Sequence, residues 1–272
     1  MRVKIINDVV TWHTEIIASL IENVDNIVKK PCNEIVLQLH PKTDKTFIEY
    51  ITNEYDHVTL SSDKCDYNIH ATFYPKDFNK FNRSDFYICH EFNHKTLQHD
   101  NIFYLTPLAG KNYIKPCVMP PITRIQANKP VYAAQGNMVA QRRNFDLVRH
   151  LLSHTSDLDY VMRFMGRGNL PEDIKEHPKV EYFRGLPHKE YHDKFSDVYC
   201  LMPLVTKSSH PNYYRNKFTT SIMYAQGYDL ATILDKELNN IYKLDKAYTF
   251  SNKPEMVDCF RKSYNEFIRS NN

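Results

Sequence analysis

The chain of 272 residues is long enough for one large domain or two ordinary ones, and 42% of its residues are hydrophobic, as in globular proteins with a buried core. Its 35 lysines and arginines are nearly balanced by 32 aspartates and glutamates, so the net charge of +3 does not indicate the basic surface that duplex nucleic acid requires. The six cysteines are scattered without a CxxC pair, which argues against a disulfide scaffold and against a zinc ribbon.

The N-terminal residues reach an acidic side chain, Asp8, before any long apolar run that could form a signal peptide. No apolar run elsewhere in the sequence is long enough to span a bilayer. We therefore expect a soluble, intracellular, cytoplasmic protein without a transmembrane segment.

Short apolar runs alternate with helical patterns through the first half of the chain. Residues 3–6 predict a strand, and apolar residues then recur at helical spacing between 15 and 24. A helix is also expected around 46–53, and further strands are expected at 34–39, 57–60, 67–73, 85–89 and 101–105. This alternation predicts an α/β domain with a mainly parallel sheet.

Three prolines interrupt this rhythm between residues 115 and 121. Such a segment is expected to be extended, and it marks a domain boundary. The rhythm then restarts, with strands expected at 131–134, 158–165, 180–183, 198–202 and 230–234. The helices of this half are expected at 144–153, 189–195, 218–226 and 254–268.

The first strand of this second half is followed by glycine and basic residues. Glycine allows the backbone to approach a phosphate group, and arginine can make paired hydrogen bonds to phosphate oxygens. The candidates for binding a diphosphate are Gly136, Asn137, Arg142 and Arg143. The alternative is an ordinary solvated loop with arginines at the start of a helix.

The next two strands end in turns that contain arginine and glycine. Exposed backbone groups in such turns suit a nucleobase or a ribose lying across them. The candidates for this role are Gly166, Arg167, Phe183, Arg184 and Pro187.

A polar loop runs into the helix expected at 218–226. Lys217 precedes Thr219, Thr220 and Ser221, so hydroxyls, backbone N–H groups and a positive charge would converge at the start of this helix. Helix N-termini favour anions, which predicts a second contact with the diphosphate. Ordinary helix capping is the alternative for Thr219.

Taken together and in order, these features resemble the donor domain of GT-B glycosyltransferases over roughly the last 140 residues. The matching stretches are residues 132–143, 165–168, 180–187, 191–203 and 217–227. The resemblance implies an α/β fold with two Rossmann-like domains that face a central cleft. Residues 1–122 would be the acceptor-side domain, residues 123–252 would bind the nucleotide-sugar donor, and residues 253–272 would form a helix that packs back on the N-terminal domain.

One part of the family pattern is absent. The familiar retaining GT-B families place a pair of glutamates around the helix that begins near Thr219, and this chain has Tyr213, Tyr214 and Ser221 where acidic residues would be expected. The acidic pair of the retaining families is therefore missing, whereas the expected diphosphate contact rests on the backbone of the helix start.

The first half offers candidates for a catalytic base. The resemblance places the acceptor near His13, whose imidazole could deprotonate a hydroxyl; the alternative is a helix N-terminal residue with Thr11 or Thr14 as the cap. His90 and Glu91 end another strand and are rival bases. The spacing of His90 and His94, with His99 beyond, is also compatible with a metal bound on a helix.

The resemblance implies transfer of a sugar from a nucleoside-diphosphate sugar to a hydroxyl of a glycan, protein or small-molecule acceptor. Neither a metal nor another cofactor is expected, and no nucleic-acid partner is expected. Two alternatives stay open. One is a catalytically silent GT-B-like module that binds a nucleotide or a glycan, and the other is a nucleotide-sugar epimerase of the same fold.

Overall fold

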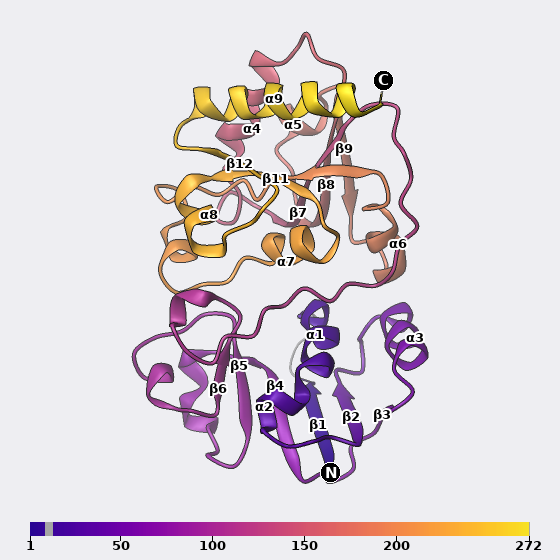
Figure 1. Ribbon diagram of the computed structural model, residues 1–272, viewed down its shortest axis with the longest axis vertical. Coiled ribbons are helices and arrows are strands. Elements are labelled where there is room, and N and C mark those ends of the chain that lie inside the picture. Colours follow the sequence, from indigo (N-terminus) through magenta and orange to yellow (C-terminus); the bar gives the residue numbers. More distant parts are fainter. Residues whose placement is uncertain (9–12, 272) are drawn as a thin grey trace. The chain divides into compact units, whose positions relative to one another are not determined.

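The computed structural model describes residues 1–8 and 13–271. The chain forms two compact units, the first comprising Met1–Pro120 with Asn216–Phe218 and the second comprising Pro121–Arg215 with Thr219–Asn272. Figure 1 labels most of the helices and strands of both units. Residues 216–218 belong to the first unit, although the sequence places them within the expected donor domain.

The first unit is built on a six-stranded parallel sheet with the order β3-β2-β1-β4-β5-β6. Its central strands contribute apolar side chains to the core, and Ile5, Ile35 and Ile69 are completely buried. The strands are β1 (Arg2–Asn7), β2 (Glu34–Leu39), β3 (Val58–Leu60), β4 (Tyr67–Phe73), β5 (Phe86–Cys89) and β6 (Ile102–Tyr104).

Helices of the first unit are short, apart from α3. Asp44 starts α3, because its carboxylate accepts hydrogen bonds from the backbone N–H groups of Thr46 and Phe47. The helices are η1 (Thr14–Ile16), α1 (Ile17–Glu22), α2 (Val24–Val28), α3 (Lys45–Glu54), η2 (Pro75–Lys80), η3 (Thr96–Gln98) and η4 (Pro107–Ala109).

The second unit contains another six-stranded parallel sheet, in the order β12-β11-β10-β7-β8-β9. Its strands are β7 (Val131–Met138), β8 (Val161–Gly168), β9 (Val180–Arg184), β10 (Val198–Leu201), β11 (Ala231–Asp235) and β12 (Ala247–Phe250). Its helices are α4 (Phe145–His154), α5 (Glu172–Lys175), α6 (His188–Asp193), η5 (Pro211–Tyr214), α7 (Thr220–Gly227), α8 (Lys236–Tyr242) and α9 (Lys253–Asn271).

The predicted α/β class and the two parallel sheets are confirmed, and the elements differ from the prediction in detail. The sequence did not indicate α2, α5, α8 or β12, all of which are short. In addition, β7 and β8 extend beyond their predicted ends, so Gly136, Asn137, Gly166 and Arg167 lie within paired strands and not in loops.

The C-terminal helix departs from the prediction that it packs on the N-terminal domain. In the structure α9 is part of the second unit, where it contacts α4, β11 and β12. Phe260 on α9 is fully buried, and its ring centroid lies 4.0 Å from that of Tyr132 and 4.7 Å from that of Tyr160. The apolar face of α9 is thus used in the core of its own unit.

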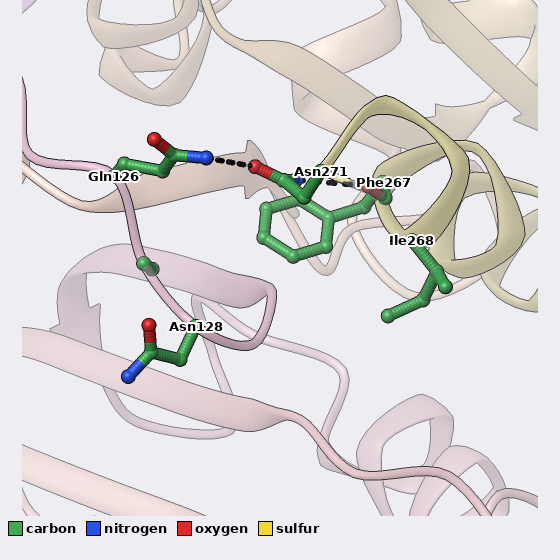
Figure 2. A pocket seen from close by; sticks show the side chains of 6 residues that line it. Gln126, Asn128, Phe267, Ile268 and Asn271 are labelled. Carbon is green, nitrogen blue, oxygen red and sulfur yellow. Dashed lines mark hydrogen bonds between the residues drawn. The ribbon is translucent and has the colours of Figure 1, made fainter.

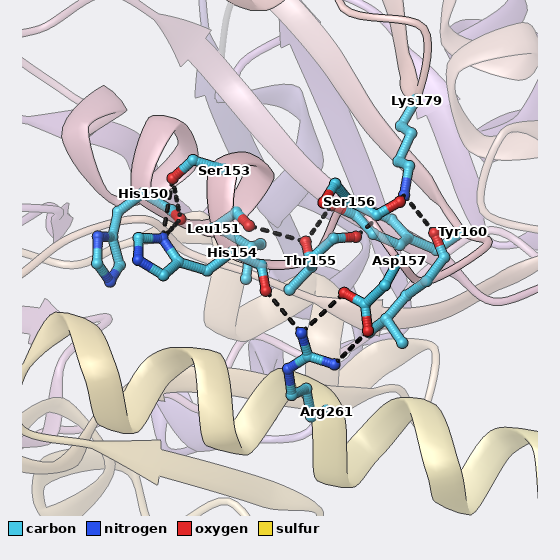
Figure 3. A network of polar contacts seen from close by, with 11 residues as sticks. His150, Leu151, Ser153, His154, Thr155, Ser156, Asp157, Tyr160, Lys179 and Arg261 are labelled. Carbon is cyan, nitrogen blue, oxygen red and sulfur yellow. Dashed lines mark hydrogen bonds and ion pairs between the residues drawn. The ribbon is translucent and has the colours of Figure 1, made fainter.

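Polar contacts also fasten α9 to the C-terminal end of α4 (Figure 3). Arg261 on α9 donates to the carbonyl oxygen of His154 at 2.7 Å and pairs with the carboxylate of Asp157 at 2.8 Å. Lys179 donates to the carbonyl oxygens of Thr155 at 3.0 Å and Ser156 at 2.9 Å, just beyond the last turn of α4. Cations are favoured at this position because the last carbonyls of a helix lack partners within it.

Within the described residues, none of the helices combines the length and the apolar character needed to cross a membrane.

Candidate functional site

Two polar clusters lie at the carboxyl ends of parallel strands, one in each unit. In the first unit the loop after β1 carries His13, and His90 directly follows β5. The two imidazole rings stack, with centroids 3.8 Å apart and an interplanar angle of 18°. The structure therefore brings together two of the three residues that the sequence suggested as a base.

The hydrogen bonds of His13 fix its tautomer. The hydroxyl of Thr72 on β4 donates to Oδ1 of Asn7 at 3.2 Å, so this hydroxyl has no second proton to give. Nδ1 of His13 lies 3.0 Å from the same hydroxyl oxygen and must be the donor. In the neutral ring, Nε2 is then the unprotonated nitrogen that can accept a proton.

The backbone of His13 is strained. Its φ of 66° lies in the left-handed region, which is uncommon for residues other than glycine. The capping alternative names Thr11 or Thr14 as the cap; Thr14 is instead the first residue of η1, and His13, which occupies the cap position, makes no side-chain capping hydrogen bond. Thr11, the other residue proposed for that alternative, lies outside the described residues.

His90 is a weaker candidate for a base. It is only 6% exposed, and its Nε2 lies 3.3 Å from the carbonyl oxygen of Ala71, to which it donates. Burial lowers the pKa of His90 to about 4; the bond to Ala71 opposes this shift and the charge of Lys217 adds to it. His90 is therefore a neutral, buried ring against which His13 is held.

Glu91 is ion-paired with Lys217, with the carboxylate 3.0 Å from Nζ. This contact arises because residues 216–218 run alongside the end of β5: the amide of Phe92 donates to Asn216 at 3.0 Å, and that of Phe218 donates to His90 at 2.8 Å. The predicted contact of Lys217 with the diphosphate stays a prediction. Its ammonium lies in the first unit and faces a carboxylate.

The alternative of a metal on a helix is not supported. Residues 90–94 are not helical, and Glu91 forms a β-bridge with Lys217. His99 packs against the rings of Phe78 and Phe81, with centroid distances of 5.1 Å and 4.5 Å. In the part of the chain that the structure describes, three or more His, Cys, Asp or Glu side chains nowhere gather as a metal site would require.

In the second unit, β7 lies between β8 and β10, which is the topological switch point of the sheet. Ligands of such folds bind beyond the carboxyl ends of the strands at this point. The predicted diphosphate residues Arg142 and Arg143 follow β7 here, and α7 follows the loop after β10.

Arg143 is 5% exposed and lies over the end of β7. Its guanidinium donates to the carbonyl oxygens of Gln135 and Arg142, while Nε has no hydrogen-bond partner among the described residues. Within those residues it also has no carboxylate at ion-pair distance. Burial lowers the pKa of Arg143, because removal from water disfavours the charged form.

Further polar groups surround Arg143. The guanidinium of the half-buried Arg142 donates to the hydroxyl of Tyr213 at 3.4 Å. Nε2 of His210 donates to the carbonyl oxygen of Ala140 at 3.2 Å and so ties the loop after β10 to the loop after β7. Burial, followed by the charges of Arg143 and Arg142, lowers the pKa of His210.

The hydroxyls at the start of α7 differ in exposure. Thr219 and Ser221 are buried, at 3% and 0% exposure, whereas Thr220 is half-buried. The side chains of Thr219 and Ser221 therefore face the interior, and the predicted contact of this helix start with a diphosphate stays a prediction. The side chain of Thr219 makes no capping hydrogen bond, so the capping alternative is not supported.

The glycines of β7 and β8 have a structural cause. Gly136 pairs with Gly166, and a Cβ on Gly166 would lie 1.9 Å from the carbonyl oxygen of Gly136. A Cβ on Gly136 would lie 2.5 Å from the guanidinium of Arg143. Close approach of the two strands and of Arg143 thus requires both glycines, independently of a ligand.

The residues predicted to bind the nucleobase are spread over two environments. Arg167, Arg184 and Pro187 are exposed near the carboxyl ends of β8 and β9, where the amide of Gly185 donates to Gly166 at 2.9 Å. Phe183 is different, because Nζ of Lys194 lies 4.2 Å from its ring centroid. That ring is used in packing within the unit.

The second unit also contains two cavities. One, of about 280 Å³, is formed by residues 126–128 and the end of α9 (Figure 2), and the side chains that line it do not titrate. The other, of about 610 Å³, contains Lys207, Asp235 and Glu237. Lys207 is ion-paired with Glu237 at 2.6 Å and Asp235 caps α8, so these charges are already engaged.

No protein-family model matches the sequence, and no curated protein matches it significantly. Solved structures do resemble it. Sucrose-phosphate synthase from Thermosynechococcus elongatus aligns over 98% of this chain and 90% of its own, with a TM-score of 0.55 and 7% identity. An alpha-glucosyltransferase in complex with UDP and a mismatched DNA aligns over the same shares of both chains, with a TM-score of 0.54 and 10% identity.

The chain has the GT-B fold. A putative UDP-N-acetylglucosamine 2-epimerase from Listeria monocytogenes is also similar, with a TM-score of 0.52, 10% identity, and coverage of 98% of this chain and 90% of its own. The GT-B fold is thus shared here by transferases and by an epimerase.

Several residues of these clusters escaped the sequence analysis. Thr72 and Asn7 orient His13, and Tyr191 and the side chain of Gln135 organise the start of α7. The sequence feature that could have identified such residues is a polar residue in an otherwise apolar strand, such as Gln135 after Val131–Ala134. A buried polar side chain needs hydrogen-bond partners, and those partners lie far away in the sequence.

Proposed function

We propose that this protein is a glycosyltransferase that transfers a sugar from a nucleoside-diphosphate sugar to an acceptor hydroxyl. In this proposal the second unit binds the diphosphate of the donor at the carboxyl end of β7. The first unit supplies the base, His13, and Glu91 and His90 are the other candidates.

The observation that carries the proposal is the buried charge of Arg143. A guanidinium that is 5% exposed and lacks a carboxylate among the described residues costs several kcal/mol of desolvation that no ion pair offsets. Arg142 adds a second positive charge next to it. An anion bound at this edge would offset that cost, and a diphosphate is the anion that this edge of a Rossmann-like sheet commonly binds.

The tautomer of His13 supports the assignment of the base. Its Nδ1 is held as a donor by Thr72, so Nε2 is the nitrogen that can take a proton from an acceptor hydroxyl. Deprotonation makes the acceptor a better nucleophile, while positive groups at the diphosphate stabilise the leaving group. The proposed reaction uses no metal, so chelation with EDTA should leave the rate unchanged.

Similarity to known structures adds support at the level of the fold. Both the sucrose-phosphate synthase and the alpha-glucosyltransferase have this architecture, and the latter structure contains UDP. We therefore propose UDP as the first nucleotide to test, beside ADP and GDP.

Binding of the donor is tested by calorimetry with UDP, ADP and GDP. We expect Arg142→Ala to weaken the affinity for the preferred diphosphate about tenfold to a hundredfold, because it removes a charge-assisted hydrogen bond. The control is Arg149→Ala, which removes a surface arginine of the same unit that is paired with Asp173. Equal affinities of wild type and Arg142→Ala would remove the proposed diphosphate site.

The base is tested with nucleotide sugars and a panel of acceptors. His13→Asn should lower kcat by about 10²–10⁴-fold and leave the affinity for the diphosphate unchanged. An epimerised sugar formed without an acceptor would identify an epimerase. Nucleotide binding without turnover of any sugar donor would identify a catalytically silent module.

A further inference from the structure

Gln135 is a buried polar residue that follows four apolar residues in β7. It is 2% exposed and follows Val131, Tyr132, Ala133 and Ala134, none of which is more than 3% exposed. A buried amide is costly unless its hydrogen-bonding groups are satisfied. The position of its partners therefore indicates why a glutamine is placed here.

Every polar group of the Gln135 side chain has a partner. Nε2 donates to Oγ1 of Thr220 at 3.1 Å and to Oγ of Ser221 at 3.2 Å, and the hydroxyl of Tyr191 donates to Oε1 at 3.1 Å. With the opposite orientation of the amide, one of its two N–H donors would face no acceptor among the described residues. A buried unsatisfied donor costs about 1–3 kcal/mol, which selects the orientation in which both N–H groups are used.

This orientation determines the role of the Thr220 hydroxyl. An amide N–H can only donate, so the hydroxyl accepts from Gln135 and keeps its own proton for another acceptor. Thr220 is half-buried at the first position of α7, beside backbone N–H groups that a helix start leaves without intrahelical partners. Ser221 accepts the second bond and is completely buried, so it anchors the amide and does not face a ligand.

We propose that Gln135 is a positioning residue that presents the Thr220 hydroxyl as a hydrogen-bond donor to the diphosphate of the substrate. The proposal rests on the function proposed above. Ionised diphosphate oxygens only accept hydrogen bonds, so a hydroxyl that is already used as an acceptor matches them. Gln135 thereby favours an anionic group over a ligand hydroxyl or amine at this position.

The test is a double-mutant cycle with Gln135→Met and Thr220→Val in the full chain, with inorganic pyrophosphate and UDP as ligands in calorimetry. We expect each single substitution to weaken pyrophosphate binding about fivefold to tenfold. If Gln135 acts through Thr220, Gln135→Met should change the affinity less than about twofold in the Thr220→Val background. Additive losses would overturn the proposal.

Two controls separate positioning from folding. Gln126→Met replaces an exposed glutamine of the same unit and should bind pyrophosphate like the wild type. Gln135→Glu should bind more weakly than Gln135→Met when its carboxylate is ionised, because the carboxylate accepts from Thr220 and repels the anion. Its affinity relative to the wild type should recover as the pH falls and this carboxyl becomes protonated, and the absence of any recovery would contradict the proposed role.

The outcomes also distinguish this inference from the proposed function. Coupled losses with pyrophosphate but no binding of any nucleotide would retain the role of Gln135 and reject the nucleotide-sugar function. Nucleotide binding without coupling would reject the role of Gln135 alone. A wild-type protein that binds no pyrophosphate would overturn the inference.

Discussion

At the scale of single residues, glycines that resemble phosphate-binding residues in the sequence are explained by the packing of the sheet. Gly136 and Gly166 face each other on β7 and β8 with φ values of 108° and 139°. These conformations are rare for residues with a side chain, and the space for a Cβ is filled by backbone at Gly166. A glycine after an apolar strand therefore indicates that another group lies close to the backbone. It does not indicate whether that group is a phosphate, a neighbouring strand or a side chain.

This explanation predicts unequal effects of two glycine substitutions. Gly166→Ala should lower the free energy of unfolding by about 3–5 kcal/mol, because strain at positive φ adds to the clash with Gly136. Gly185→Ala should cost only about 1 kcal/mol, since Gly185 has a φ of 66° but no atom within 4 Å of the added Cβ. Urea unfolding of both variants measures the difference. Similar losses of unfolding free energy would show that the backbone shifts to relieve the clash between Gly166→Ala and Gly136.

At the scale of elements, strongly patterned segments were predictable and weakly patterned ones were not. The strand β2 is an apolar run and α4 has an amphipathic pattern with Asn144 as its N-cap, so both were predicted within one residue of their observed ends. The strand β12 lies at the edge of its sheet. Of its four residues Phe250 is buried, and the other three are half-buried. Such a segment carries little periodicity, and its pairing with β11 determines its conformation.

The contact of Lys179 with the end of α4 gives a prediction at this scale. Lys179→Met should lower the free energy of unfolding by about 1–2 kcal/mol, because the last carbonyls of the helix region lose a charged donor. The matched control is Lys175→Met, since Lys175 makes an exposed pair with Glu172, and this variant should stay within about 0.5 kcal/mol of the wild type. Denaturant unfolding of the two variants provides the test, and equal losses would contradict a capping role for Lys179.

At the scale of the whole molecule, each unit contains a buried neutral histidine. His90 belongs to the first unit and His192, which is 3% exposed among aromatic rings, belongs to the second. Burial lowers the pKa of His90 to about 4, and it lowers that of His192 well below its ordinary value. Between these values and the unfolded pKa of about 6.5, the unfolded chain binds more protons than the folded one.

Both units should therefore lose stability as the pH falls below about 6.5. Across this window, each histidine should lower the free energy of unfolding by up to about 1.4 kcal/mol for every unit by which the pH falls. Above this window the two histidines should not change stability with pH. Urea unfolding between pH 7 and roughly pH 5 should show this decline, and His192→Phe should reduce its slope. An unchanged slope in His192→Phe would show that other groups cause the dependence on pH.

The sequence alone determined the class, the approximate positions of most elements and the resemblance to GT-B donor domains. Local patterns carry this information, because the period of apolar residues and the residues at helix ends act over a few positions. The same local information placed His13, His90 and the two arginines at the ends of strands.

Only the tertiary structure decided which of these residues meet. The stacking of His13 on His90, the pairing of Lys217 with Glu91, and the bonds of Gln135 to Thr220 and Ser221 join segments far apart in the chain. The burial of Thr219 and Ser221 and the place of α9 in the second unit depend on the same long-range packing. Such contacts follow from strand order and register, which no local pattern encodes.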